Sequence, residues 1–184
     1  MCYGGWRLPE ENLGPLPRPD LRLTGVFVGV VVIGLLIGWV FRTGDVAVAE
    51  IGRPAPDFTV SLIEGGTFTL SDPLNDDNRR VVLNLWASWC IPCRTEIPEI
   101  SAFANANPDV KVIGVSVEDT EKAARAFADE FSPAFDLGLS NAEFDAAYPR
   151  LGLPVTYIIG TNGVVEEVFN GIVNQEILED ITTG

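Results

Sequence analysis

Two nearly continuous apolar runs constrain the fold of this chain more than any other feature of its sequence. They are VVLNLW at residues 81–86 and VKVIGVSV at residues 110–117. Such runs are typical of strands that are buried on both faces of a sheet. Each run is followed by a segment with apolar residues at helical spacing, at residues 91–107 and 119–131. This order of strand, helix, strand and helix predicts an α/β sandwich in which right-handed crossovers join parallel strands.

Shorter segments on either side of this unit extend the pattern. Two hairpins are predicted, with their strands at residues 58–62 and 67–70, and at residues 155–159 and 164–169. Their turns contain Glu64-Gly65-Gly66 and Asn162-Gly163, which favour tight reversals of the chain. Two further helices are predicted at residues 141–147 and 175–181. All of these elements fit into a single domain at residues 54–184.

A long apolar segment precedes this domain. Residues 23–41, LTGVFVGVVVIGLLIGWVF, carry no charge and are bounded by Arg22 and Arg42. A helix of this length is about 28 Å long, which matches the hydrocarbon core of a bilayer. The segment therefore predicts a transmembrane helix, and the arginines before it favour a cytoplasmic location for residues 1–22.

Two interpretations of the apolar segment stay open. It is either an uncleaved signal anchor or a secretory signal peptide that is cut after Ala47-Val48-Ala49, which has the small-x-small form of a cleavage site. The segment is longer than the usual signal-peptide core of about 7–15 residues, which favours the anchor. Either interpretation predicts that the domain is exported and joined to the helix by a linker at residues 42–53. Cys2 would then remain in the cytoplasm as a free thiol.

Composition argues against two classes of function. The chain has 26 acidic and 12 basic side chains and a formal net charge of −14. Such a charge repels phosphate backbones, so nucleic-acid binding is not expected. The chain has three cysteines and no histidine. A zinc site needs about four ligands, which the chain cannot assemble from these residues, so we expect no metal and no other cofactor.

The stretch WASWCIPC at residues 86–93 places Cys90 between a predicted strand and the start of a predicted helix. A thiol attacks as the thiolate, and the unpaired N–H groups and dipole at a helix N-terminus stabilise that anion. Pro92 fits the first helical turn, where its missing N–H needs no partner. Cys93 lies one turn on, within reach of a disulfide with Cys90. The arrangement predicts reversible dithiol–disulfide exchange without a histidine.

Other uses of the two cysteines fit less well. A copper-delivery site of the cysteine-plus-histidine kind lacks its histidine. A structural disulfide that closes so short a loop would add little stability, because the entropic gain grows with loop length. A peroxidase on a similar α/β core needs only one attacking cysteine and stays open as a minor alternative.

Three motifs together resemble the thioredoxin superfamily and, within it, the membrane-anchored TlpA/ResA-like and CcmG/DsbE-like thiol-disulfide oxidoreductases. They are WASWCIPC with Arg94, Glu96 and Pro98 after it, GLPVT at residues 152–156, and an opening with Gly52, Ala55, Pro56 and Phe58. The resemblance covers about residues 51–181. It implies a thioredoxin-like three-layer sandwich with an N-terminal β-hairpin and a central insertion at roughly residues 118–148.

The resemblance also implies roles for individual residues. Cys90 would be the exposed nucleophile and Cys93 the buried resolving thiol. Pro154 would be a cis-proline that faces the disulfide, and the chain at Leu153 would pair with the substrate backbone. Trp89 and Pro92 would complete the substrate-binding surface. From the residues alone, Pro154 could also be an ordinary trans proline that starts a strand, and Trp89 fits the core equally well.

One acidic residue stands out beside the cysteines. Where thioredoxin has a buried, proton-handling aspartate six residues before the first cysteine, this chain has Asn84, which cannot titrate. The resemblance to the ResA-like branch assigns that role to Glu96, whose charge would raise the pKa of the thiols and mediate proton transfer. The alternative is an ordinary first-turn glutamate favoured by the helix dipole. Glu118 is a weaker candidate and fits a solvated cap better.

The resulting hypothesis is an extracytoplasmic thiol-disulfide oxidoreductase that is tethered to the bilayer by its N-terminal helix. The resemblance favours reduction of protein disulfides, with apocytochrome c before haem attachment as the substrate and a membrane protein as the electron donor. The alternatives are a general disulfide reductase, a thiol peroxidase-like antioxidant enzyme, and a non-catalytic binding module in which CIPC is locked as a disulfide.

Overall fold

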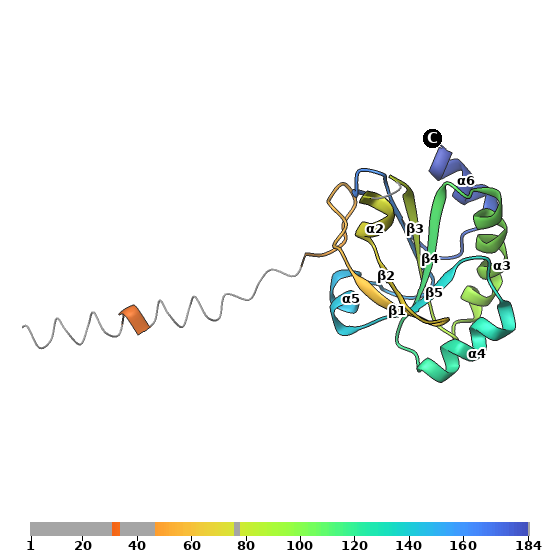
Figure 1. Cartoon of the computed structure of the whole chain (residues 1–184), viewed down its shortest axis with the longest axis horizontal. Helices are drawn as coiled ribbons and strands as arrows, with labels where there is room; N and C mark the ends of the chain where they lie inside the picture. Colours follow the sequence, from red (N-terminus) through yellow and green to blue (C-terminus); the bar gives the residue numbers. More distant parts are fainter. Residues whose placement is uncertain (1–30, 34–46, 76–77, 184) are drawn as a thin grey trace, which may run out of the picture. The chain divides into compact units, whose positions relative to one another are not determined.

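The computed structural model describes residues 31–33, 47–75 and 78–183 of the chain (Figure 1). The chain divides into two units, Met1–Asp45 and Val46–Gly184, and every element named below belongs to the second. Apart from the helical residues 31–33, the predicted transmembrane segment lies outside the described residues, as do its N-terminal flank and Cys2. No helix in the described part of the chain is both long enough and apolar enough to cross a membrane.

A mixed seven-stranded sheet forms the centre of the domain, in the order β2-β1-β5-β4-β3-β6-β7. The strands are β1 (Thr59–Leu62), β2 (Thr67–Thr69), β3 (Arg80–Trp86), β4 (Val110–Ser116), β5 (Asp136–Leu139), β6 (Val155–Ile159) and β7 (Val165–Asn170). β4 pairs in parallel with β3 and β5, whereas β6 pairs antiparallel with β3 and β7. β1 and β2 form an antiparallel hairpin. The predicted parallel crossover and both predicted hairpins are therefore confirmed.

Helices cover both faces of the sheet. They are α2 (Ser71–Asn75), α3 (Ile91–Ala106), α4 (Glu121–Phe131), α5 (Ala142–Ala147) and α6 (Gln175–Thr183). α3, α4 and α6 pack on one face, and α2 and α5 pack on the other (Figure 1). The sheet between two helical layers confirms the predicted α/β sandwich and the three layers that the resemblance implies.

Side chains of β3 alternate between the two faces of the sheet and are buried on both. Val81, Leu83 and Leu85 belong to the core beneath α5, whereas Val82 and Trp86 pack on the side of α3. All five residues have an exposed fraction of 0%. The unbroken apolar run therefore marks a strand that is covered on both faces, as expected.

Two elements were not predicted from the sequence. β5 has only the residues DLGL and is stabilised by pairing with β1 on one side and β4 on the other. A Cβ atom at Gly138 would come within 2.8 Å of Val60 Cγ2, so the close approach of these strands requires glycine. α2 is a single turn, and the N–H of Ser71 at its start donates to Asp57 Oδ1 at 3.0 Å. Both elements depend on partners that are distant in sequence.

The last part of the predicted linker is folded onto the domain. Ala49 is buried, and its N–H donates to Ala147 O at 2.8 Å. The N–H of Gly52 donates to Val165 O at 2.8 Å. These backbone hydrogen bonds join α5 and β7 to residues that we expected to lie outside the domain.

Candidate active site

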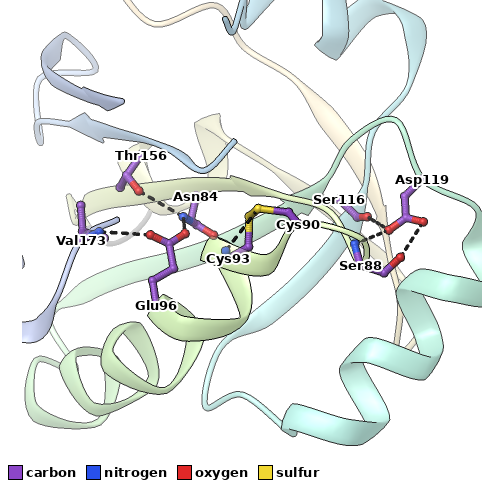
Figure 2. The surroundings of a disulfide bond; sticks show 9 residues. All are labelled: Asn84, Ser88, Cys90, Cys93, Glu96, Ser116, Asp119, Thr156 and Val173. Atoms are coloured by element: carbon purple, nitrogen blue, oxygen red, sulfur yellow. Dashed lines mark hydrogen bonds between the residues drawn. A yellow bond between two sulfur atoms is a disulfide. The ribbon is translucent and has the colours of Figure 1, made fainter. Parts of the chain in front are cut away.

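Cys90 is the N-cap of α3, as predicted from its place between strand and helix. Its backbone is extended, with φ −81° and ψ 105°, and the N–H of Cys93 donates to Cys90 Sγ at 3.2 Å. Pro92 lies in the first turn of the helix. The two sulfur atoms form a disulfide, and the two Cα atoms are 5.3 Å apart (Figure 2). The chain therefore holds a redox-capable pair at a helix N-terminus.

The expectation of an exposed Cys90 is wrong for this disulfide-bonded form. The exposed fraction is 3% for Cys90 and 0% for Cys93. Both residues belong to an apolar cluster that also includes Trp86, Ala87 and Ile97. The Cys90 side chain turns inward because it caps the helix and bonds to a buried cysteine.

Exposed apolar side chains surround the buried disulfide. Trp89 is 58% exposed, which excludes the core position that its residue type also fitted, and its Nε1–H donates to Glu118 O at 3.1 Å. Ile91, between the two cysteines, is 77% exposed, and Leu151 is fully exposed. Pro92 is also exposed. No contact role was assigned from the sequence to Ile91, which lies within the cysteine motif, or to Leu151, which directly precedes GLPVT.

The peptide bond between Leu153 and Pro154 is cis, as the resemblance implies. In the β3–β6 ladder, Val155 is opposite Leu85, so Pro154 comes level with Trp86 at the end of β3. Leu153 packs against the apolar cluster that contains both cysteines. The loop at residues 148–154, called the cis-proline loop below, therefore lies beside residues 87–90, the cysteine turn, which lead into the disulfide.

Glu96 is fully buried, one helical turn after Cys93 (Figure 2). Its Oε1 accepts a hydrogen bond from Asn84 Nδ2 at 2.7 Å, and its Oε2 accepts one from the N–H of Val173 at 3.1 Å. Burial raises the pKa of Glu96 from 4.5 to about 7, although the two hydrogen bonds lower it in part. A glutamate whose only role is a favourable interaction with the helix dipole would lie in solvent. This carboxyl can instead exchange a proton near neutral pH.

Asn84 links Glu96 to the neighbouring strand. Its Nδ2 also donates to Thr156 Oγ1 at 3.1 Å. Its Oδ1 is buried and has no hydrogen-bond partner among the described residues. In Figure 2 the amide lies between Glu96 and Cys93, with its oxygen toward the cysteine. Asn84 therefore holds Glu96 in place without adding a second acid.

A second carboxylate, Asp119, holds the chain that leads into the cysteines. It accepts hydrogen bonds from the N–H of Ser88 at 2.6 Å, from Ser88 Oγ at 3.0 Å and from Ser116 Oγ at 3.2 Å. Neither Asp119 nor Ser88 was identified as a site residue in the sequence analysis. Glu118 is exposed and pairs with Arg150, so it is unsuited to proton transfer at the buried thiol. Within the described ranges, no three cysteine, aspartate or glutamate side chains are placed to hold a metal ion.

Known proteins share this sequence pattern. The model of the AhpC/TSA family matches residues 51–168. Thioredoxin-like protein YneN of Bacillus subtilis is 31% identical over 161 residues, which cover 82% of this chain and 92% of that protein. Thiol-disulfide oxidoreductase ResA of Oceanobacillus iheyensis is 31% identical over 139 residues, with coverages of 73% and 72%. Thiol:disulfide interchange protein DsbE of Xylella fastidiosa is 31% identical over 170 residues, with coverages of 89% and 84%.

The fold is also found in a solved structure. A crystal structure of a Chlorobium tepidum protein, assigned as a thiol:disulfide interchange protein DsbE, superposes with a TM-score of 0.65 at 26% identity. The match covers 72% of this chain and 94% of that chain. The predicted resemblance to ResA-like and DsbE-like proteins is confirmed. The chain belongs to the AhpC/TSA family and is a thiol-disulfide oxidoreductase related to ResA and DsbE.

Proposed function

We propose that the chain reduces disulfide bonds in protein substrates through a Cys90/Cys93 dithiol. The observation that carries this proposal is the disulfide at the N-terminus of α3, one helical turn from the buried carboxyl of Glu96. A readily ionised thiol, a second thiol to complete the exchange and a group to move a proton are what the reaction requires.

The reaction begins with the reduced protein. The Cys90 thiolate attacks one sulfur of the substrate disulfide, a mixed disulfide forms, and the other substrate sulfur leaves as a thiolate. Cys93 then attacks Cys90 Sγ, which releases the second substrate sulfur and closes the disulfide of the protein. The substrate gains two electrons and two protons, and a donor dithiol must return the electrons to this chain.

Glu96 acts on the proton of the resolving thiol. Cys93 must lose its proton before it attacks, and it is buried with an exposed fraction of 0%, so bulk water does not reach it in this form. A carboxyl with a pKa of about 7 accepts that proton readily at neutral pH. Asn84 orients the carboxyl through the 2.7 Å hydrogen bond.

The substrate chain is bound between the cysteine turn and the cis-proline loop. The backbone at Leu153 pairs with the substrate, and Pro154 fixes the direction of that backbone. Trp89 and Pro92 form the opposite side of the surface. The exposed side chains of Trp89, Ile91 and Leu151 support this proposal, because a group of apolar side chains in solvent is suited to contact with an unfolded chain.

The domain works outside the cytoplasm in this proposal, tethered by residues 23–41. The charge-free apolar run of 19 residues supports the tether, because a helix of that length matches the hydrocarbon core of a bilayer. A membrane protein that carries electrons outward would be the donor. Apocytochrome c before haem attachment would be the substrate, since its two neighbouring cysteines must be reduced before the haem is bound.

Substrate capture tests the proposed substrate. A full-length Cys93→Ala protein is expected to stop at the mixed disulfide, because the resolving thiol is missing. Captured partners are separated on non-reducing gels and identified by mass spectrometry. Haem-binding polypeptides with paired cysteines would support cytochrome maturation, whereas capture of unrelated disulfide proteins alone would overturn that substrate in favour of general reduction. All of these proteins carry Cys2→Ala, which removes the third thiol of the chain. A protein that also carries Cys90→Ala is the control and should capture nothing.

The pH dependence of alkylation tests the role of Glu96. Glu96→Gln is expected to lower the pH midpoint of Cys90 alkylation by about one unit, because a nearby negative charge disfavours the thiolate. Rates with iodoacetamide are measured on the reduced protein from pH 5 to 10. The control is Glu99→Gln, which removes an exposed charge from the same helix. An unchanged midpoint in Glu96→Gln would mean that Glu96 does not act on the thiols.

A further inference from the structure

The connection between β4 and α4 touches both loops that border the disulfide. The N–H of Val117 donates to Trp86 O at 2.9 Å, which continues the strand pairing to the end of β3. The next two residues, Glu118 and Asp119, contact the cysteine turn and the cis-proline loop through side chains and backbone. Neither residue has a part in the exchange steps described above.

Asp119 fixes the cysteine turn. Its carboxylate accepts three hydrogen bonds from Ser88 and Ser116 (Figure 2). It accepts a fourth from the N–H of Thr120 at 2.8 Å. The shortest of these, at 2.6 Å, comes from the backbone N–H of Ser88, two residues before Cys90. Hydrogen bonds to an ionised acceptor are roughly twice as strong as neutral ones. The backbone that leads into Cys90 is therefore held by Asp119, a residue that belongs to neither β3 nor α3.

Glu118 joins the cysteine turn to the cis-proline loop. Its backbone has φ +52°, in the left-handed region that is uncommon for residues other than glycine. In this conformation its carbonyl oxygen accepts the Trp89 Nε1–H at 3.1 Å. Its carboxylate pairs with Arg150 at 3.0 Å, and Arg150 also pairs with Asp145 at 3.1 Å.

Glu118 contacts the side chains of Trp89 and Arg150, which belong to the two sides of the proposed substrate-binding surface. Arg150 directly precedes Leu151, which is fully exposed, and lies four residues before the cis-proline. Trp89 is 58% exposed and therefore has little core packing to fix its ring. The side chain of Arg150 is only 10% exposed, so its pairing with Glu118 is partly shielded from water. A substrate chain between these loops needs both of them at a fixed separation.

We infer that Glu118 and Asp119 are positioning residues for disulfide exchange. Asp119 fixes the position of the cysteine turn, and Glu118 fixes the distance between Trp89 and the cis-proline loop. This inference rests on the proposed function, because it concerns the surface on which the protein disulfide is bound. The inference predicts different effects for the two residues. Loss of the Glu118 carboxylate should impair reactions with large substrates only, whereas loss of the Asp119 carboxylate should impair every reaction of Cys90.

The test compares a large disulfide with a small reagent on the full-length reduced protein. Insulin is the protein disulfide, with dithiothreitol as the source of electrons. Iodoacetamide probes Cys90 in a Cys2→Ala background, since Cys93 is buried. Glu118→Gln is expected to raise the KM for insulin about two- to fivefold, the scale of one partly exposed ion pair, with kcat and the alkylation rate unchanged. Asp119→Asn is expected to slow both reactions, because an amide cannot accept all of the hydrogen bonds from Ser88.

Glu121→Gln is the matched control, because it removes one acidic charge close by in the sequence, three residues after Glu118 and two after Asp119. Glu121 is exposed and pairs with Arg125 on its own helix, away from either loop. It should leave both reactions as in the wild type. Thermal unfolding of each variant separates positioning from loss of fold, and Arg150→Met should reproduce the KM effect of Glu118→Gln.

The results separate this inference from the proposed function. If the wild type reduces insulin and Glu118→Gln has the same KM, the role of Glu118 is overturned while the proposed function stands. Equal losses with insulin and iodoacetamide in Glu118→Gln would also overturn it, because they indicate general damage to the site. If the wild type does not reduce insulin at all, the proposed reductase function fails first.

Discussion

Cys90→Ala is expected to reduce the rate of protein disulfide reduction to the background rate. Cys90 is the N-cap of α3, where backbone N–H groups favour the thiolate, and Cys93 is buried within the first turn. No other described cysteine can replace it as the attacking group. Loss of a covalent nucleophile removes about three orders of magnitude or more of activity. The measurement is the reduction of insulin by dithiothreitol, which is followed by turbidity.

The companion variant, Cys93→Ala, should behave differently. It retains the attacking thiol, so it should react once with a substrate disulfide and then stop. Both variants are made in a Cys2→Ala background, which removes the third thiol of the chain. Their shared lack of the short disulfide makes each a stability control for the other. Turnover by Cys90→Ala within tenfold of the wild type would assign the attack to Cys93 and reverse the mechanism.

The cysteine motif could be predicted from the sequence because its determinants are local. An apolar run leads directly into Cys90, and Pro92 and the apolar spacing after it define the helix start. Every strand and helix that was predicted within the domain begins and ends within two residues of its predicted bounds. A separation of three residues at a helix start also fixes the distance between the two cysteines, whose Cα atoms are 5.3 Å apart.

The partners of Glu96 could not be predicted, because they come from two segments that are distant from it in the sequence. Asn84 lies on β3, and Val173 is 77 residues further along the chain than Glu96. Only the packing of α3 between β3 and the chain before α6 brings these groups together. The resemblance indicated that Glu96 is functional, but the burial that raises its pKa is a property of the folded domain.

The solvent exposure of the residues around the disulfide could not be predicted from the sequence either. The motif gives the order of Trp89 and Cys90 but not which of them faces solvent. That choice depends on the β4–α4 connection, where Glu118 O binds the indole N–H and Asp119 holds Ser88. Trp89 therefore lies outside, in agreement with its expected place on the substrate-binding surface, whereas Cys90 lies inside, contrary to its expected exposure.

The stability of the oxidised domain is expected to fall as the pH rises from about 4.5 to 7, because of Glu96. Burial raises the pKa of this carboxyl from 4.5 to about 7 in the folded protein, so the folded state retains a proton that the unfolded chain releases. Stability decreases with pH wherever the folded state binds more protons. The contribution is fully present below pH 4.5 and is lost as the pH rises through 7. At 1.36 kcal/mol per unit, the contribution is roughly 3 kcal/mol.

Urea unfolding of the full-length oxidised protein, followed by tryptophan fluorescence between pH 4.5 and 8, measures this contribution. Other acidic groups also titrate in this range, so the informative quantity is the difference between the wild type and Glu96→Gln. That difference should change by roughly 3 kcal/mol in favour of the variant as the pH rises, because the variant has no buried carboxyl to ionise. The exposed Glu143 provides a control, and Glu143→Gln should follow the wild type at every pH. Parallel curves for the wild type and Glu96→Gln would mean that Glu96 does not hold the extra proton, and its assignment as the proton acceptor for Cys93 would fail with it.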